Sequence, residues 1–397
     1  MRTPDLNWIK DPRVFQVNRL HAYSDHIYTI GKDKKPSSFS LNGTWKFNLS
    51  KNYDSCFKFF YNTEFNDSNW NDIQVPGHIQ LQGFDKPHYT DVTYPWDGHD
   101  VVKPGQIDMD KNKVYQYRKT FDCPQDFIGN KLILSFEGAE SNIYVWLNGK
   151  FIGYAEDSFT PSRFDITKYT QEKDNVLCVR IFQKCTGTWL EDQDMWRFTG
   201  IFRDVMIYKQ PSLHIQDLKI DTDIDLDTNK SVLSCVCKMS SNESHTLQAK
   251  LYDPQGNIVW NGNMQDTFEI PVENTCLWSS EFPNLYQLEL VLYDTNNEII
   301  ETIQEQVGFR KFTLEYGIMK LNGKRIVFHG INRHEWDPKT GRCLSQEQME
   351  EDIHILKSLN INAVRTSHYP NNSYWYKLCD QYGIYVIDEM NLETHGA

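Results

Sequence analysis

The residues best suited to chemistry stand at the end of the sequence, in the polar run from Asn391 to His395. Glu393 and His395 are two positions apart, so both side chains project from one face if the chain there is an extended strand. A carboxylate and an imidazole on one face can bind a single cation, although two ligands do not complete a site. We therefore expect Glu393 and His395 to belong to a metal site that needs further ligands.

The segments that must position this run alternate between strands and helices. The apolar pattern predicts three short buried strands, over residues 325–331, 361–366 and 384–387. Ser345 and Gln348 match a capping box, which predicts a helix over 345–359, and a second amphipathic helix over 375–382 is expected to end at Gly383. Strands separated by helices of this length predict right-handed crossovers and a parallel sheet, as at the start of a (β/α)8 TIM barrel.

The predicted barrel is incomplete. A closed barrel of this kind has eight strand and helix units in about 250 residues, and only three strands are predicted here. An open parallel sheet exposes an edge and an apolar face that proteins normally cover. We therefore expect the chain to be the N-terminal part of a longer protein, or to work with a second chain.

Each predicted barrel strand leads into a polar run, and in such barrels the chemistry lies where strands enter their following loops. These runs are residues 332–335, 367–370 and 388–395. His334 and His368 are candidate site residues on this ground, although either one alone would more often be structural. Arg365 is expected to be a structural counter-ion for Asp388 and Glu389.

Most of the chain before the barrel is predicted to be β structure. Residues 38–209 are typical of a jelly-roll sandwich, in which Asn148 and Gly149 form the turn of a hairpin. Residues 210–311 have the short strands of an immunoglobulin-like sandwich. The predicted organisation is therefore an N-terminal arm (1–37), a jelly-roll domain (38–209), an immunoglobulin-like domain (210–311) and the start of a TIM barrel (312–397).

The segment from Thr188 to Arg197 places three acidic residues between two tryptophans. It is either a solvated acidic loop or part of a sugar pocket, because carboxylates accept hydrogen bonds from hydroxyls while indole faces pack on the C–H surface of a sugar ring. The two interpretations are about equally supported by the residues alone. The segment from His88 to Trp96 has the same mixture and the same two interpretations.

The composition excludes several classes of partner. The net charge of −13 argues against nucleic acid and against an anionic membrane surface. No apolar stretch is long enough to span a bilayer, and no signal segment begins the sequence. The nine cysteines are scattered without paired spacing, so a reducing cytoplasm is the expected location.

The chain resembles the large β-galactosidases of glycoside hydrolase family 2 over nearly its whole length. The resemblance lies in the strings at residues 41–45, 189–197, 330–335, 363–370 and 393–396, and in the order of the domains. It implies hydrolysis of terminal β-D-galactose from β-galactosides such as lactose, with retention of configuration.

The resemblance also implies roles for individual residues. Glu393 and His395 match magnesium ligands, and Asp194 matches an aspartate that contacts the sugar and a sodium ion. His334 and His368 match histidines that contact galactose and support the transition state. Asp91 stands where the family usually has asparagine, at the border of the galactose pocket, which leaves its sugar contact open because an ionised carboxylate only accepts hydrogen bonds.

The family's acid/base and nucleophilic glutamates have no counterpart in this sequence. A retaining glycosidase needs both groups, so we expect the isolated chain to be inactive. A homo-oligomer of a full-length form and a complementing C-terminal chain are the expected partners. Two alternatives stay open, a non-catalytic carbohydrate-binding protein and a family member specific for β-glucuronides or β-mannosides.

Overall fold

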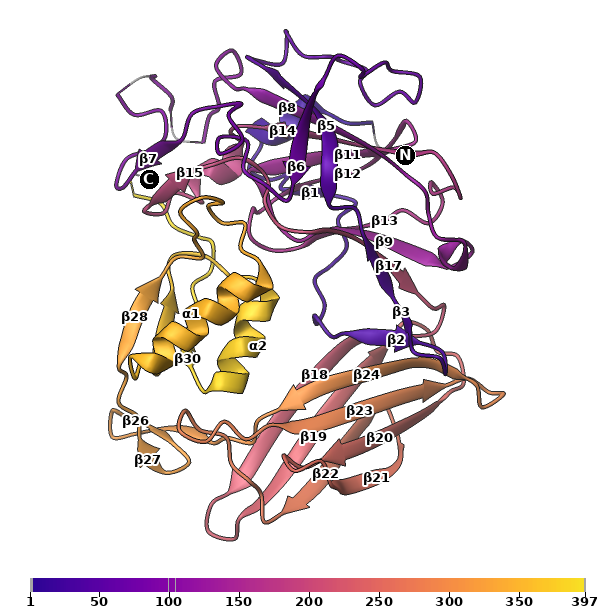
Figure 1. Cartoon of the computed structure of the whole chain (residues 1–397), viewed down its shortest axis with the longest axis vertical. Coiled ribbons are helices and arrows are strands. Elements are labelled where there is room, and N and C mark those ends of the chain that lie inside the picture. The colour runs from indigo at the N-terminus through magenta and orange to yellow at the C-terminus, as the bar shows by residue number, and fades with distance from the viewer. Residues whose placement is uncertain (1–2, 99, 104, 396–397) are drawn as a thin grey trace.

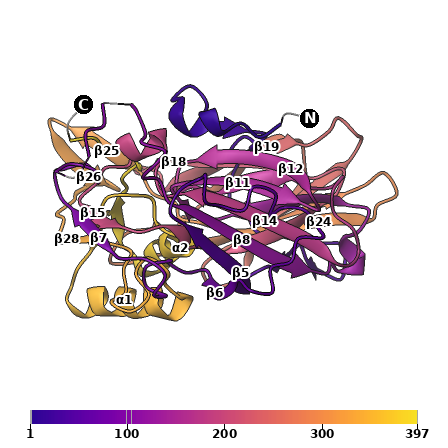
Figure 2. The same cartoon turned by 90° about the horizontal axis from the view of Figure 1, so that it is seen from above.

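The computed structural model describes residues 3–98, 100–103 and 105–395 and shows three parts (Figure 1). A jelly roll lies at the top of the view, an immunoglobulin-like sandwich lies at the bottom, and a unit of parallel strands and helices lies between them on the left. The view from above shows this unit beside the jelly roll, with α1 on the outside (Figure 2). This architecture agrees with the predicted fold class.

Two facing antiparallel sheets form the jelly roll. One has the strand order β1-β12-β11-β14-β8-β5-β6 and the other has the order β13-β9-β17-β4. Between them lies an apolar core that includes Trp45, Phe136 and Val179. The predicted hairpin is confirmed, since β11 and β12 join through Asn148 and Gly149, which have φ angles of 50° and 75°.

The strands of the two jelly-roll sheets are β1 (Gln16–Val17), β4 (Ser38–Ser40), β5 (Gly43–Ser50), β6 (Asn71–Val75), β8 (Val114–Phe121), β9 (Lys131–Phe136), β11 (Asn142–Leu147), β12 (Lys150–Glu156), β13 (Ser162–Asp165), β14 (Asn175–Phe182) and β17 (Val205–Gln210). Two short ribbons accompany them, β7 (His88–Thr90) with β15 (Met195–Arg197) and β10 (Ala139–Glu140) with β16 (Gly200–Ile201). Three 3-10 helices are η1 (Leu6–Lys10), η2 (Gln125–Phe127) and η3 (Thr186–Trp189).

The immunoglobulin-like sandwich packs a sheet of order β18-β19-β22 against one of order β21-β20-β23-β24-β2-β3. Residues 16–30 connect the two β domains, because β1 pairs with β12 of the jelly roll and β2 pairs with β24 of the sandwich. The strands are β2 (Tyr28–Ile30), β3 (Lys35–Pro36), β18 (Ile215–Asp225), β19 (Lys230–Met239), β20 (Thr246–Tyr252), β21 (Ile258–Met264), β22 (Thr267–Glu273), β23 (Tyr286–Tyr293) and β24 (Ile299–Val307).

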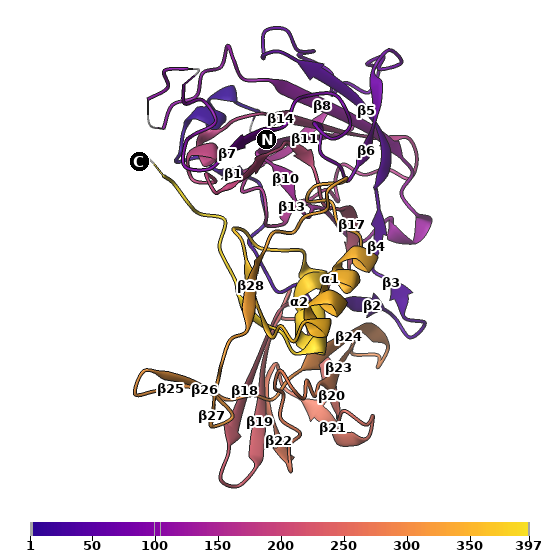
Figure 3. The same ribbon diagram turned by 60° about the vertical axis from the view of Figure 1, so that its left-hand side comes forward.

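The third part contains a small antiparallel sheet followed by the barrel start. Strands β28, β29 and β30 pair in parallel, and both helices lie on one side of them (Figure 3). The predicted capping box of Ser345 and Gln348 is confirmed, as is the end of the second helix at Gly383, where φ is 73°. The elements are β25 (Phe312–Glu315), β26 (Ile318–Leu321), β27 (Lys324–Arg325), β28 (Gly330–Arg333), α1 (Gln346–Ser358), β29 (Ala363–Thr366), α2 (Ser373–Tyr382) and β30 (Tyr385–Ile387).

The predicted buried strand over 325–331 is wrong in place and in burial. The strand is β28, which begins at Gly330, and Val327 and Ile331 are 54% and 42% exposed. Ile387 of β30 is 53% exposed, whereas Met349 and Ile353 of α1 are buried on the helix side. Both exposed isoleucines lie on the edge strands of this sheet: Ile331 is in register with Val364 on the helix side, and Ile387 is in register with Arg365 on the opposite side. Among the described residues, no helix has the length and apolar character needed to cross a membrane.

Candidate functional site

A pocket of about 310 Å³ lies between the jelly roll and the barrel start. Its size is in the range of small-molecule sites, which start at about 300 Å³. The lining combines the two predicted residues Asp194 and His334 with aromatic and apolar side chains and one arginine, namely Tyr89, Met195, Trp196, Trp336, Arg342 and Tyr369. Residues that are far apart in the sequence thus form a single polar and aromatic pocket, as the sugar-pocket interpretation of the tryptophan-rich segment requires.

Asp194 is positioned by the short ribbon of β7 and β15. Trp196 pairs with Tyr89 across this ribbon, and the Tyr89 hydroxyl donates a hydrogen bond to Asp194 Oδ1 at 2.5 Å. This hydrogen bond raises the pKa of Tyr89, because ionising the phenol would remove the proton that Asp194 accepts. Among the described residues, none hydrogen-bonds the second carboxylate oxygen of Asp194 in competition with a ligand, and the carboxylate borders the pocket.

His334 and His368 follow two neighbouring parallel strands, β28 and β29, and their ring centroids are 5.3 Å apart. Partial burial, followed by the charges of His368 and Arg342, lowers the pKa of His334. The charged form of His334 is therefore disfavoured, and its neutral ring offers hydroxyl groups one donor nitrogen and one acceptor nitrogen. The predicted pair of histidines is brought together by the structure.

The orientation of His368 is set by two charged neighbours. Its Nδ1 lies 3.0 Å from Glu389 Oε2 and 3.3 Å from Arg365 Nη2. Glu389 can only accept and is the closer of the two, so we assign the proton to Nδ1, where it is donated to Glu389, and Arg365 Nη2 then makes no hydrogen bond to this nitrogen. The other ring nitrogen, Nε2, is then the acceptor.

The carboxylates that follow β30 have structural partners. Arg365 Nε donates to Glu389 Oε1 at 2.5 Å, which confirms the prediction that Arg365 is a counter-ion. Asp388 accepts hydrogen bonds from Thr366 at 2.9 Å and from the Tyr376 hydroxyl at 2.6 Å. Both carboxylates are therefore occupied in holding β29, β30 and α2 together.

The chain after β30 crosses to the jelly roll and pairs with the tryptophan-rich segment (Figure 3). Asp192 N–H donates to the Glu393 carbonyl at 3.1 Å, and Glu393 N–H donates to the Leu190 carbonyl at 2.7 Å. Gln193 adds a side-chain hydrogen bond to Asn391 at 2.8 Å. Asp192 and Gln193 are both fully buried, so the interpretation of this segment as a solvated acidic loop is wrong: its polar residues bind another domain instead of water.

Glu393 and His395 converge as predicted. His395 Nε2 lies 3.1 Å from Glu393 Oε1, and His395 Nδ1 lies 3.6 Å from Asp192 Oδ2. Two adjacent ligand atoms of an octahedral Mg²⁺ are about 3 Å apart, given bond lengths of about 2.1 Å, so this pair fits two ligand positions. Asp192 Oδ2 makes no hydrogen bond to His395 at this distance, although its buried negative charge lies next to the second imidazole nitrogen. Within the described residues, no group of three or more His, Cys, Asp or Glu side chains could by itself hold a metal ion.

Two predicted sugar-binding residues, Asp91 and His368, do not line the pocket; His368 lies beside it, with its ring 5.3 Å from that of His334, whereas Asp91 lies outside. The side chain of Asp91 is exposed, and it is absent from the pocket lining. It does lie close enough to Tyr89 for its charge to raise the pKa of the tyrosine. The residues that sequence reasoning missed are Tyr89, Trp336, Tyr369 and Arg342. A signal existed for Tyr89, which stands in the polar and aromatic segment 88–96.

Comparison with known proteins identifies the family. Three family models described as glycosyl hydrolases family 2 match in succession, the sugar binding domain over residues 39–211, a domain that carries the family name alone over 213–310, and the TIM barrel domain over 312–397. The chain belongs to glycosyl hydrolase family 2. The family's three domain types thus occur in the order that the structure shows.

Curated relatives and solved structures extend this result. A β-galactosidase of Halalkalibacterium halodurans is 50% identical over 406 residues, which are 99% of this chain and 40% of that protein. A β-galactosidase large subunit of Leuconostoc lactis is 42% identical, over 99% of this chain and 66% of that protein. A β-glucuronidase of Ruminococcus gnavus superposes with a TM-score of 0.74 at 21% identity, over 94% of this chain and 60% of that chain, which shows the common fold. The chain therefore spans well under half the length of the first of these family 2 relatives.

Proposed function

We propose that this chain provides the galactose-binding side of the active site of a retaining β-galactosidase, which hydrolyses terminal non-reducing β-D-galactose residues in β-galactosides such as lactose. The observation that carries the proposal is the shared pocket of Asp194 from the jelly roll and His334 from the barrel start. The names of relatives at 42% to 50% identity, which are β-galactosidases, support the choice of sugar.

Each residue of the pocket, and His368 beside it, has a proposed role that follows from its chemistry. Asp194, held by Tyr89, accepts hydrogen bonds from sugar hydroxyls. His334 and His368 exchange hydrogen bonds with ring hydroxyls, and these bonds can strengthen as charge develops in the transition state. Trp196, which is 42% exposed, presents an indole surface to the C–H face of the sugar.

Bond cleavage needs two further carboxyl groups. In a retaining glycosidase they lie about 5 to 5.5 Å apart, one acting as nucleophile and one as acid and base. Glu389 is unsuited to either task because Arg365 and His368 hold it, and Asp194 is held by Tyr89. We propose that both glutamates belong to the part of the family barrel that this chain does not span. On this proposal residues 1–397 alone are inactive.

Two cations fit the proposal. Magnesium would be held by Glu393 and His395, with the buried charge of Asp192 next to the imidazole, and sodium by Asp194. When bound, these ions would supply positive charge beside the sugar and the acid/base group. Until they bind, Glu393 and His395 keep each other in place through their mutual contact.

The charges of the pocket favour a neutral sugar over a uronic acid. Asp194 borders the pocket, and its carboxylate would repel the carboxylate of a glucuronide. Arg342, the arginine of the lining, is already paired with Glu140. The likeness to β-glucuronidases at 21% identity therefore extends to the fold and not to the substrate.

We further propose that the exposed edge strands β28 and β30 are covered by the remaining barrel strands, supplied by a longer form of the chain or by a complementing C-terminal chain. Ile331 and Ile387 are the exposed residues that such strands would bury. The name "large subunit" carried by the Leuconostoc lactis relative supports the second arrangement. A homo-oligomer of the complete enzyme and a cytoplasmic location, which suits nine free cysteines, belong to the same proposal.

A chromogenic galactoside assay tests the proposal. Residues 1–397 alone are expected to show no turnover, and mixing with a polypeptide that carries the remaining barrel of a family β-galactosidase is expected to restore it. Matched glucuronide and mannoside substrates should stay uncleaved by the mixture. Turnover by the isolated chain at a rate ordinary for glycosidases would overturn the assignment of the missing carboxyl groups.

Calorimetry with galactose separates the enzyme from a non-catalytic carbohydrate-binding protein. The hypothesis of a non-catalytic carbohydrate-binding protein is favoured by the intact sugar-contact side of the pocket. Tight galactose binding by residues 1–397, without any gain of activity in the mixture, would support a carbohydrate-binding protein and contradict the proposed β-galactosidase.

A further inference from the structure

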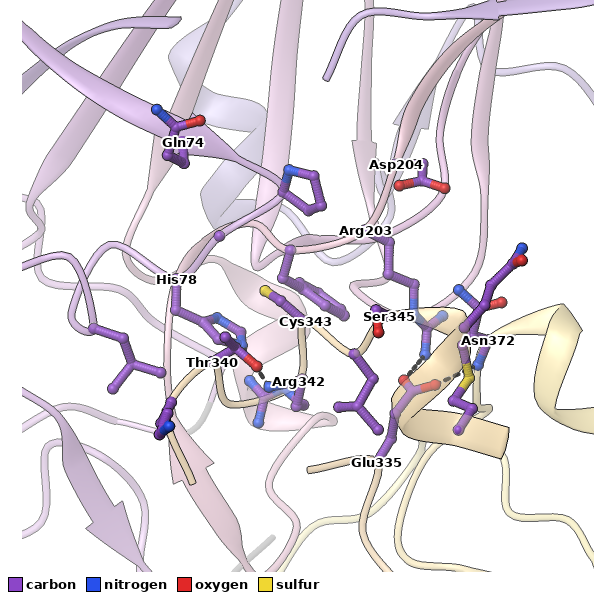
Figure 4. Close-up of a pocket in the computed structure, with 18 of the residues that line it drawn as sticks. Gln74, His78, Arg203, Asp204, Glu335, Thr340, Arg342, Cys343, Ser345 and Asn372 are labelled. Atoms are coloured by element: carbon purple, nitrogen blue, oxygen red, sulfur yellow. Dashed lines mark hydrogen bonds and ion pairs between the residues drawn. The ribbon is translucent and has the colours of Figure 1, made fainter. Parts of the chain in front are cut away.

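Arg342 is buried at the contact between the jelly roll and the barrel start, with 1% relative exposure. It stands in the loop after β28, the same loop that begins with His334. Figure 4 shows Arg342 against His78, on the jelly-roll side of this contact. An arginine is almost never buried this fully without partners, so its contacts indicate what it is there to hold.

Three separate jelly-roll elements bind Arg342. Its backbone N–H donates to Nε2 of His78, after β6, at 3.0 Å. Its Nη1 donates to the carbonyl of Trp196, in β15, at 3.0 Å. Its Nη2 forms an ion pair with Glu140, in β10, which is itself buried. A single residue of the barrel unit thus joins three elements of the other domain.

The loop is shaped to deliver Arg342 to these partners. Gly341 has a φ angle of +63°, and a Cβ at this position would lie 2.7 Å from Cδ2 of His78. A larger residue would therefore push the loop away from the jelly roll. Asp337 closes the loop through reciprocal backbone hydrogen bonds with Gly341 at 2.8 and 2.9 Å.

The element that Arg342 holds is the ribbon of β7 and β15, which forms one wall of the pocket. Each strand has three residues, and the two strands pair only with each other in the described sheets. An isolated two-stranded ribbon is marginally stable, so it needs contacts from outside. The ribbon carries Tyr89 and Trp196 and directly follows Asp194, so its position sets the position of the proposed sugar contacts.

We propose that Arg342 is a positioning residue of the sugar pocket, which holds the ribbon through the Trp196 carbonyl and thereby fixes Asp194 relative to His334. Glu140 compensates the buried charge and allows Arg342 to occupy this place. The sugar part of this inference rests on the proposed function, whereas the ribbon part does not. Arg342 acts through Trp196 and Asp194, and no contact with the reacting atoms is assigned to it.

Three variants separate positioning from stability, namely E140Q, R342Q and the double variant E140Q/R342Q. Either single change leaves a buried charge unpaired and is expected to lower the melting temperature. The double variant replaces the ion pair with two neutral amides, an exchange that is often nearly neutral, so its melting temperature should recover. The lost hydrogen bond to Trp196 does not recover. The double variant also remains informative if R342Q alone fails to fold.

Amide hydrogen exchange at residues 88–90 and 195–197 measures the ribbon directly. In the double variant these amides should exchange about tenfold faster than in the wild type, and the galactose dissociation constant of the active enzyme should rise about tenfold, or about 1.4 kcal/mol. The matched control is R203Q/E335Q, which removes a second buried arginine and glutamate pair across the same contact without touching the ribbon. Its ribbon exchange should equal that of the wild type.

The outcomes distinguish this inference from the proposed function. Wild-type ribbon protection in a stable E140Q/R342Q protein, or affinity that recovers together with the melting temperature, would overturn the positioning role. Faster ribbon exchange combined with a wild type that binds no galactoside would support the role of Arg342 and overturn the proposed function.

Discussion

The substitution Glu335→Gln tests how strongly the jelly roll and the barrel start depend on the buried ion pair between them. Glu335 is 1% exposed and its Oε2 lies 2.7 Å from Nη2 of Arg203, which is 6% exposed. Its other oxygen accepts the Asn372 N–H at 2.7 Å, as Figure 4 also shows. A glutamine has one acceptor oxygen for these two donors, so its amide group must face one of them while Arg203 keeps an uncompensated charge.

The expected cost follows from this geometry. Removing one partner of a buried pair destabilises by about 3 to 5 kcal/mol, because the remaining charge stays buried and unpaired. We expect E335Q to lower the free energy of unfolding by that amount, measured by urea titration with tryptophan fluorescence. The control is K219Q, which removes an exposed pair whose side chains are 72% and 62% accessible and should leave the free energy of unfolding essentially unchanged.

Two results would contradict this reasoning. A loss below about 1 kcal/mol in E335Q would mean that water or another group compensates Arg203, and that the contact is not dry. The double variant R203Q/E335Q should regain most of the stability that E335Q loses, because it leaves no charge behind. A double variant as unstable as E335Q would show that the shape of the pair, and not its charge, holds the domains together.

Three further predictions concern protonation, sugar and metal. Burial lowers the pKa of His78 well below 6.5, so the folded state binds fewer protons than the unfolded state. The free energy of unfolding should therefore fall as the pH drops below 6.5, by up to about 1.4 kcal/mol per pH unit. In H78Q this part of the decline should vanish when unfolding is compared at neutral and acidic pH. D194N should weaken galactose binding about 10- to 150-fold through the loss of a charged hydrogen bond, whereas D91N, at an exposed position outside the pocket, should stay within about twofold by calorimetry. With Mn²⁺ as a spectroscopic probe, H395A should abolish Mn²⁺ binding and D192N should weaken it about 10- to 100-fold. Equal Mn²⁺ affinity in the wild type, H395A and D192N would place the metal elsewhere.

Local signals were enough to predict several elements from the sequence. The capping box at Ser345 and the glycine at 383 mark helix ends through hydrogen bonds and dihedral angles within a few residues. The turn at Asn148 and Gly149 is equally local, because only residues that tolerate positive φ suit it. Elements whose geometry is decided within one turn of chain can therefore be predicted without knowledge of the rest of the fold.

Burial and long-range contacts could not be predicted in the same way. Val327 and Ile331 have the residue types of a buried strand, but burial depends on what packs against them, and the described chain covers them only in part. The opposite error concerns Asp192, whose residue type suggests solvent although it is fully buried against Arg197 and His395. In both cases the deciding partner lies elsewhere in space, and hydrophobic or acidic character alone does not identify it.

Only part of the pocket lining was predicted from the sequence, and its assembly was not predicted at all. Spacing and resemblance pointed to Asp194 and His334, yet neither showed that a three-residue ribbon carries the first and that the loop of the second holds this ribbon through Arg342. Because the ribbon depends on the barrel loop, formation of the sugar pocket is coupled to docking of the two domains. Conditions that separate the domains should then abolish galactoside binding while the jelly-roll core around Trp45 and Phe136 remains folded, since that core lies between the jelly roll's own two sheets.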